Sequence, residues 1–138
     1  AVQLHFEPKY AGGFEKYIRR FPRTKVIIDH LGRPLQGTPA EHARVFRWAR
    51  YPNTIIKVAS LPAPGSKTPR PIGPIIHRLV TAYGPERSIY GGGFNGMATP
   101  ASYRAYRERV SGFLAKFSAR DRAHVLGGTA ARIFGFAG

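Results

Sequence analysis

Short strand-like segments alternate with segments of helical period along most of this chain. The strand-like segments are apolar and rich in β-branched residues, and the helical ones repeat apolar residues every three or four positions. The predicted strands are residues 2–6, 25–29, 54–60 and 87–90, and the predicted helices between them are residues 14–20, 38–50 and 75–83. Repeated strand–helix order favours parallel strands joined by right-handed crossovers. The sequence therefore predicts an α/β fold made of four parallel βα units.

Helix starts and breaks are marked by local motifs. Residues 38–41 read Thr-Pro-Ala-Glu, a capping box with proline at the first helical position. Thr99 and Pro100 mark the start of a helix whose apolar stripe continues to Phe117. Residues 118–121 mark another start, and residues 129–134 predict a last helical turn or two. Residues 61–74 are rich in proline and glycine and are predicted to form a loop.

The length of 138 residues suits one domain with a modest core, and we expect residues 1–138 to form it. No apolar run reaches the roughly 18 residues that a membrane span needs. The chain has no cysteine, which excludes disulfides, thiolate metal sites and cysteine nucleophiles. A reducing compartment is compatible with that composition, and we expect a cytoplasmic protein.

Four βα units are about half of an eight-stranded barrel. The chain opens with Ala1 inside a strand-like pattern, so we expect a processed or incomplete chain. A lone half-barrel would leave two apolar edge strands open. Three arrangements remain: a missing N-terminal half, self-association that closes the barrel, or an open four-stranded sheet.

The formal net charge is +15, from 22 basic and 7 acidic residues. Such a charge attracts nucleic acid or anionic surfaces without sequence specificity. The basic residues are spread along the chain, however, and no zinc-finger spacing, RNP-type motif or basic heptad array accompanies them. A nucleic-acid-binding module is therefore the least favoured of the functions considered.

Ionisable residues stand where two predicted strands end. Asp29 and His30 follow the apolar run of residues 26–28, and His5 lies near the end of the first strand. The carboxyl ends of parallel strands share one edge of the sheet, where ligands bind. Neighbouring strands lie about 5 Å apart, so His5 and His30 could together hold one cation or one anionic substrate.

A catalytic zinc ion usually has three protein ligands, and the two histidines supply only two. Glu7 and Asp29 are the neighbouring carboxylates. If the strand pleat persists, Asp29 points to the face opposite His30, which favours Glu7 as the third ligand. The remaining histidines, His42, His77 and His124, lie within predicted helices and are expected to be surface or packing residues.

Four segments resemble, in order, the C-terminal half of the amidohydrolase-related (amidohydrolase 2) family of TIM-barrel proteins. They are IIDHLGRP, YPNTIIKVAS, YGPERSIYGGGF and VLGGTAARIFGF. The family contains hydrolases, lactonases and decarboxylases, often metal-dependent. The resemblance implies that the strands here correspond to strands five to eight of a barrel.

The resemblance also implies roles for single residues. His5 matches a metal-ligand position of some members, and His30 matches the histidine that binds metal, substrate or a reacting carbonyl oxygen. Arg33 belongs to the same motif, beside the site. Lys57 stands where members carry a lysine on the seventh strand of the barrel, and it could clamp a substrate carboxylate.

The last strand departs from the family pattern. Gly93 stands where members carry an aspartate that acts as metal ligand and general base, and glycine has no group for either role. Tyr90 and Phe94, on either side of the three glycines, are expected to be walls of a substrate site. The spacing of these glycines matches no phosphate-binding motif, which favours a tight turn.

These observations favour a hydrolase acting on a small carbonyl or carboxylate substrate such as a lactone, amide or ester. His30 would orient or polarise the substrate, His5 would assist or bind a metal, and Arg33 and Lys57 would contact the substrate. A divalent metal such as zinc and no cofactor at all remain equally open. The alternative is a non-catalytic half-barrel used for assembly or binding.

Overall fold

The sheet contains four parallel strands in the order β1-β2-β3-β4. A computed structural model describes residues 1–92 and 96–136. The strands are β1 (Val2–Leu4), β2 (Val26–Ile28), β3 (Thr54–Val58) and β4 (Ser88–Tyr90). All three neighbouring pairs are parallel, and the residue pairs Leu4–Ile28 and Ile28–Ile56 fix the register of the first three strands. The predicted α/β fold with parallel strands is confirmed.

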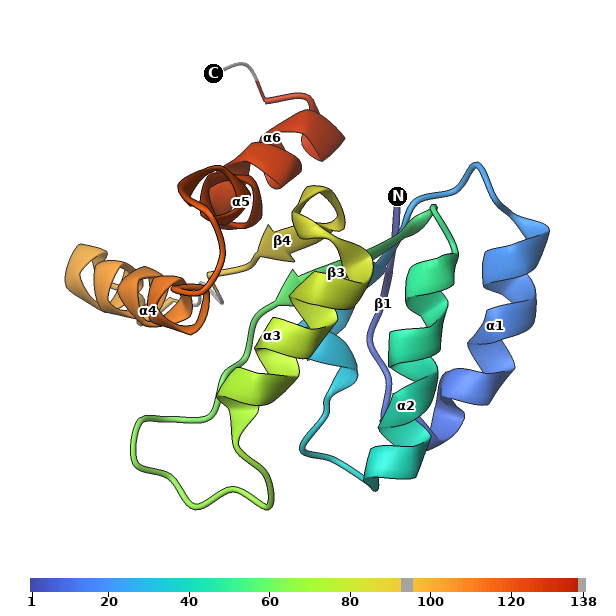
Figure 1. Cartoon of the computed structure of the whole chain (residues 1–138), viewed down its shortest axis with the longest axis horizontal. Coiled ribbons are helices and arrows are strands. Elements are labelled where there is room, and N and C mark those ends of the chain that lie inside the picture. Colours follow the sequence, from blue (N-terminus) through green and yellow to red (C-terminus); the bar gives the residue numbers. More distant parts are fainter. Residues whose placement is uncertain (93–95, 137–138) are drawn as a thin grey trace.

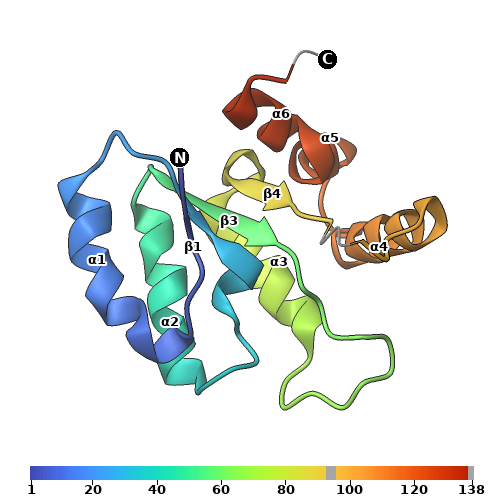
Figure 2. The same cartoon turned by 180° about the vertical axis from the view of Figure 1, so that it is seen from behind.

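Three helices connect the strands and cover one face of the sheet (Figures 1 and 2). The helices are α1 (Ala11–Arg20), α2 (Pro39–Arg47), α3 (Ile72–Tyr83), α4 (Pro100–Phe113), α5 (Ala119–Ala123) and α6 (Thr129–Phe134). α1, α2 and α3 are the crossovers between consecutive strands, as parallel pairing requires. The predicted capping box is present, with the Thr38 side chain accepting from the Glu41 backbone and the Glu41 side chain accepting in return. No helix within the described ranges is long and apolar enough to cross a membrane.

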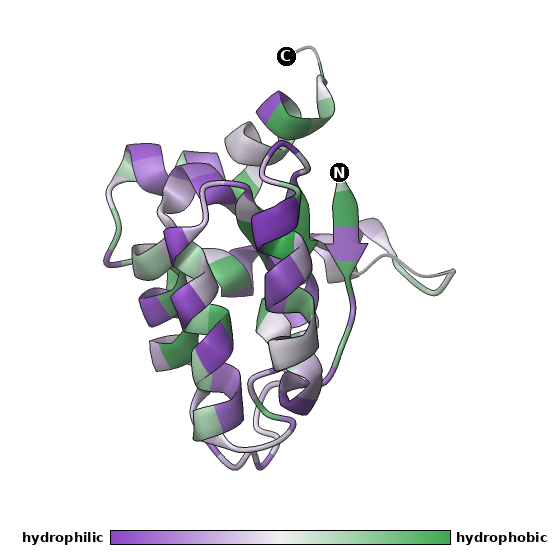
Figure 3. Ribbon diagram, turned by 90° about the vertical axis from the view of Figure 1, so that its right-hand side faces the viewer, coloured by the Kyte–Doolittle hydropathy of each residue, from purple (hydrophilic) through white to green (hydrophobic). Residues whose placement is uncertain are grey.

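The two faces of the sheet bury different amounts of apolar surface. Alternate strand residues such as Val26, Ile28, Ile56 and Val58 belong to one large core on the side of α1–α3. The helices contribute their apolar faces to this core, and the helices nearest the viewer in Figure 3 carry both hydrophilic and hydrophobic residues. The other face holds a small separate cluster of three strand isoleucines, Ile27, Ile55 and Ile89. Ala130 and Ile133 of α6 pack against them.

Several predicted boundaries are wrong by a few residues. β1 and β3 are shorter than residues 2–6 and 54–60, because the chain leaves the sheet once the interstrand ladder ends. α3 begins at Ile72, inside the segment predicted to be a loop, since a proline in the first helical turn costs no internal hydrogen bond. The helix that begins at Pro100 was predicted to continue to Phe117, but α4 ends at Phe113.

Candidate active site

The backbone turns sharply where β2 ends. Asp29 to Gly32 form a short 3-10 turn, and His30 and Leu31 take left-handed conformations with φ values of 49° and 58°. Arg33 follows with a φ of 53°. Gly32 has a φ of 66°, and a Cβ there would lie 2.7 Å from a Val45 methyl group, so glycine is needed for the close packing of this turn on α2. The turn re-aims the His30 side chain away from the direction set by the strand.

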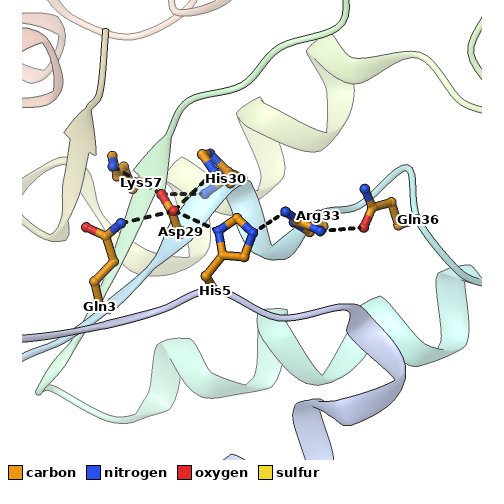
Figure 4. Close-up of polar contacts among 7 residues, drawn as sticks. All are labelled: Gln3, His5, Asp29, His30, Arg33, Gln36 and Lys57. Atoms are coloured by element: carbon orange, nitrogen blue, oxygen red, sulfur yellow. Dashed lines mark hydrogen bonds and ion pairs between the residues drawn. The ribbon is translucent and has the colours of Figure 1, made fainter. Parts of the chain in front are cut away.

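Asp29 is the centre of a polar cluster at the carboxyl ends of three strands (Figure 4). Its Oδ2 atom lies 3.0 Å from Gln3 Nε2, 3.2 Å from His5 Nδ1 and 3.1 Å from His30 Nε2. Its Oδ1 atom lies 3.1 Å from Lys57 Nζ and accepts the His30 backbone N–H. Burial alone would raise the pKa of Asp29, but the hydrogen bonds from His5 and Lys57 outweigh it and lower the pKa. Asp29 is therefore a buried, ionised carboxylate at neutral pH.

The expected orientation of Asp29 is wrong. The pleat does not persist beyond Ile28, so the left-handed turn brings the His30 ring back onto the carboxylate. Glu7, the expected third metal ligand, is exposed and pairs with Lys9 at 2.9 Å. The sequence does carry a signal for Asp29: Gln3 and His5 share one face of β1, and Ile27 and Asp29 share the matching face of β2.

His5 and His30 lie side by side, with ring centroids 5.0 Å apart and ring planes nearly perpendicular. The separation is the one expected from the strand spacing. Burial lowers the pKa of His30, and the neighbouring Asp29 charge offsets this only in part. His30 is therefore neutral at pH 7, with a proton on Nε2 to share with Asp29. Its Nδ1 atom is buried and has no hydrogen-bond partner among the described residues.

Lys57 reaches the cluster from β3, the strand next to β2. It lies on the same face as Ile89, its register partner, and its side chain passes directly over Gly91. A Cβ at position 91 would lie 2.4 Å from Lys57 Cε, which is closer than real atoms approach. The glycine at position 91 therefore leaves room for the Lys57–Asp29 ion pair.

A pocket of about 180 Å³ opens beside His30. Its polar lining comes from His30, Arg33, Gln36 and Ser60, and its apolar lining from Leu31, Pro34, Leu35, Pro62 and Ile72. The non-glycine residues with positive φ in the described part of the chain all line this pocket: His30, Leu31, Arg33 and Ser60. Backbone strain of this kind collects at functional sites, because only surrounding contacts hold it.

Arg33 joins this pocket to the cluster. Its guanidinium contacts His5 Nε2 and donates to Gln36 Oε1 at 3.1 Å. Arg33 was expected beside the site, and it does line the same pocket as His30. It also contacts His5, which was not expected.

The remaining expected site residues lie apart or outside the described ranges. Tyr90 packs against Tyr103 and Tyr106, with ring centroids 6.1 Å away from each, and belongs to the helix-facing core. Burial raises the pKa of Tyr90 to about 12. Gly93 and Phe94 lie outside the described residues. A substrate contact by Tyr90 or Phe94 stays a prediction.

Three side chains of the cluster could hold a metal ion. His5, Asp29 and His30 each offer one ligand atom, and these atoms lie within 4.8 Å of one another. Ligands about 2.0–2.1 Å from a tetrahedral zinc ion stand about 3.3 Å apart. The distances from Asp29 Oδ2 to the two imidazole nitrogens, 3.2 and 3.1 Å, are close to that edge length. The number and type of the donors therefore suit a zinc ion once the His30 proton has moved from Nε2 to Nδ1, with Lys57 holding the second carboxylate oxygen.

Parallel βα units with polar side chains at the carboxyl ends of the strands place the chain in the class of α/β proteins that includes the barrels. Within that class, a protein-family model described as Amidohydrolase matches residues 1–136. The chain therefore belongs to the amidohydrolase family. No curated protein matches it in sequence.

Solved structures share its fold. An amidohydrolase from Burkholderia multivorans with bound zinc matches with a TM-score of 0.78 and 20% identity, covering 98% of this chain and 52% of that one. The same enzyme with bound HEPES gives a TM-score of 0.81 and 21% identity, covering 98% and 53%. Amidohydrolase 2 from Bifidobacterium longum subsp. infantis gives 0.66 and 20%, covering 98% and 49%. The chain thus spans about half the length of these structures, and the predicted half-barrel is confirmed.

Proposed function

We propose that this chain supplies half of a hydrolase active site that acts on a small carbonyl substrate such as a lactone, amide or ester. The observation that carries the proposal is the convergence of Gln3, His5, His30 and Lys57 on one buried carboxylate, Asp29. Buried charged clusters at strand ends cost folding free energy, and such clusters concentrate at functional sites. The family membership and the pocket beside His30 support the same conclusion.

In this proposal each residue of the cluster has a distinct task. Asp29 holds His30 through Nε2 and fixes the orientation of its neutral ring toward the pocket. His30 orients the reacting carbonyl group, and Arg33, at the same pocket, attracts a substrate carboxylate. Lys57 stabilises the ionised state of Asp29.

His5, Asp29 and His30 would hold a divalent metal such as zinc. A bound zinc ion supplies a Lewis acid and a water molecule of lowered pKa. The zinc in the Burkholderia multivorans structure supports this assignment. Because residue 93 is glycine, Asp29 is the one buried carboxylate in residues 1–92 and 96–136 that could take part.

The test uses matched histidine substitutions. His30→Gln should lower kcat/KM on a panel of small lactones, esters and amides by about 100-fold or more, because positioned acid–base and polarising groups contribute on that scale. His77→Gln, on α3 against Phe117, is the control and should leave the rate unchanged. Circular dichroism checks that both variants fold. Equal activity of His30→Gln and the unsubstituted protein would refute the assignment.

A second function, assembly, is favoured by a groove at the edge of the sheet. The groove has a volume of about 270 Å³ and is lined by residues of β1, α1 and β2: Val2, Leu4, Phe14, Tyr17, Ile18, Phe21, Thr24 and Val26. Val2, Tyr17 and Phe21 are each about half exposed. Since the matched structures are twice as long, we propose that another parallel strand and helix pack here, as in a closed barrel.

The assembly proposal is tested by mass. The chain alone should form dimers or larger species at micromolar concentration in sedimentation experiments, and Tyr17→Lys should shift it toward monomer because a charge enters the apolar groove. Thr81→Lys, at an exposed position of α3 outside the groove, adds the same charge and is the control. A chain that stays monomeric with the groove intact would argue against self-association through this edge.

A further inference from the structure

The contact between Arg33 and His5 determines where the proton of the His5 ring lies. A guanidinium group has five N–H donors and no acceptor. His5 Nε2 faces the Arg33 guanidinium, so it must be the acceptor of that hydrogen bond. In a neutral imidazole the other nitrogen then carries the proton. Nδ1–H donates to Asp29 Oδ2 at 3.2 Å, which agrees with this assignment.

A metal ion needs the opposite arrangement. The nitrogen of His5 nearest to Asp29 and His30 is Nδ1, and it can bind a cation only through a free lone pair. The ring proton must then move to Nε2, through solvent and with no net change in the number of bound protons. At Nε2, however, the N–H group would point at another donor, Arg33. Metal-binding histidines normally donate their second N–H to a carboxylate, a carbonyl or water.

We propose that Arg33 is a positioning residue that controls cation binding: the Arg33–His5 contact and a metal ion at the cluster exclude each other. The inference rests on the proposed metal role of His5, Asp29 and His30. A metal binds only when the guanidinium withdraws from His5. Arg33 has an alternative position, since it is partly exposed, bonded to Gln36 and part of the lining of the pocket beside His30.

The first measurement reads the tautomer directly. In the metal-free protein, two-dimensional 15N–1H NMR of the histidine side chains should show His5 with its proton on Nδ1. In Arg33→Met the Nδ1 preference should weaken, because the donor at Nε2 is gone. A metal-free protein with the His5 proton on Nε2 would overturn the proposal.

The second measurement is zinc affinity by calorimetric titration with zinc alone. Arg33→Met should bind zinc about tenfold tighter than the unsubstituted protein, the scale on which outer partners of metal ligands act. Arg33→Gln should bind tighter still, because a side-chain carbonyl can accept the His5 Nε2–H. Arg23→Met, an exposed arginine outside the cluster, controls for the lost charge. The difference in zinc affinity between the Arg33 variants and the unsubstituted protein should persist in about 0.5 M salt. Salt at that concentration screens charge–charge interactions between exposed groups.

The outcomes separate this inference from the proposed function. Unchanged zinc affinity in both Arg33 variants would refute the exclusion between Arg33 and metal. His30→Gln tests the ligand set itself and should weaken zinc binding. If His30→Gln binds zinc as the unsubstituted protein does, the metal role of the cluster fails, even where NMR has found the His5 proton on Nδ1.

Discussion

The two faces of the sheet differ in what they bury and in what they do. The helix-facing side is one large apolar core that reaches from α1 to α4. The opposite side has three isoleucines under α6 and, toward the carboxyl ends of the strands, the Asp29 cluster. Alternate residues of the same strands build both sides. The comparison shows that one face supplies the stability of the fold and the other is free to hold charged groups.

The face opposite α1–α3, called the inner face here, is the one that the other half of a barrel would cover. In a closed barrel the inner faces of all strands pack against one another. Here the isoleucines of the inner face pack against α6, the one helix that contributes residues to their cluster in the described part of the chain. Substitutions on the two faces should therefore differ in cost, even at neighbouring positions.

The largest expected effect comes from a pair of adjacent isoleucines in β3. Ile56→Ala, in the large core, should lower the free energy of unfolding by about 4 kcal/mol, and Ile55→Ala, in the small cluster, by about 2 kcal/mol. Both side chains are nearly inaccessible, at 0% and 4% exposed, so exposure alone does not separate them. Urea denaturation measures both. Equal losses would mean that the two faces pack equally well, and would remove the contrast.

A smaller effect is expected at Gly91, on the inner face. Gly91→Ala forces Lys57 to move, because a Cβ would lie 2.4 Å from Lys57 Cε. The flexible end of a lysine can move at little cost, so stability should fall by less than about 1 kcal/mol. The Lys57–Asp29 ion pair should be lost, however, and activity should fall about tenfold, as in Lys57→Met.

The double variant Gly91→Ala with Lys57→Met gives the control for this prediction. If glycine serves only to make room for the lysine, the two changes should not add, and the double variant should be as active as Lys57→Met alone. Additive losses in kcat/KM would show that Gly91 acts on the site independently of Lys57.

Periodicity predicted the helix-facing side well and the polar cluster only in part. Runs such as residues 26–28 identify strands, and a capping box such as the one at Thr38 identifies a helix start. The strand order, the shared edge and the proximity of His5 and His30 follow from those elements. The contact between Asp29 and His30 was not predictable from alternation, because it depends on left-handed conformations at His30 and Leu31. Such conformations come from tertiary packing and leave no signal in local composition.

The smallest expected effect concerns the pH dependence of stability, to which the apolar face contributes nothing. The folded-state pKa of Asp29 is lowered, chiefly through hydrogen bonds from His5 and Lys57 that outweigh burial. In the unfolded chain an aspartate has a pKa of about 3.9. The stabilisation is therefore fully present above about pH 4, where Asp29 is ionised in both the folded and the unfolded chain. It is lost as the pH falls through the lower folded-state pKa.

The variant Asp29→Asn tests this prediction, because it keeps the shape of the side chain but cannot ionise. The unfolding free energy of the unsubstituted protein should fall more between pH 5 and pH 3, both roughly one unit from that aspartate value, than that of Asp29→Asn. Parallel curves would mean that Asp29 is no better solvated by the cluster than by water.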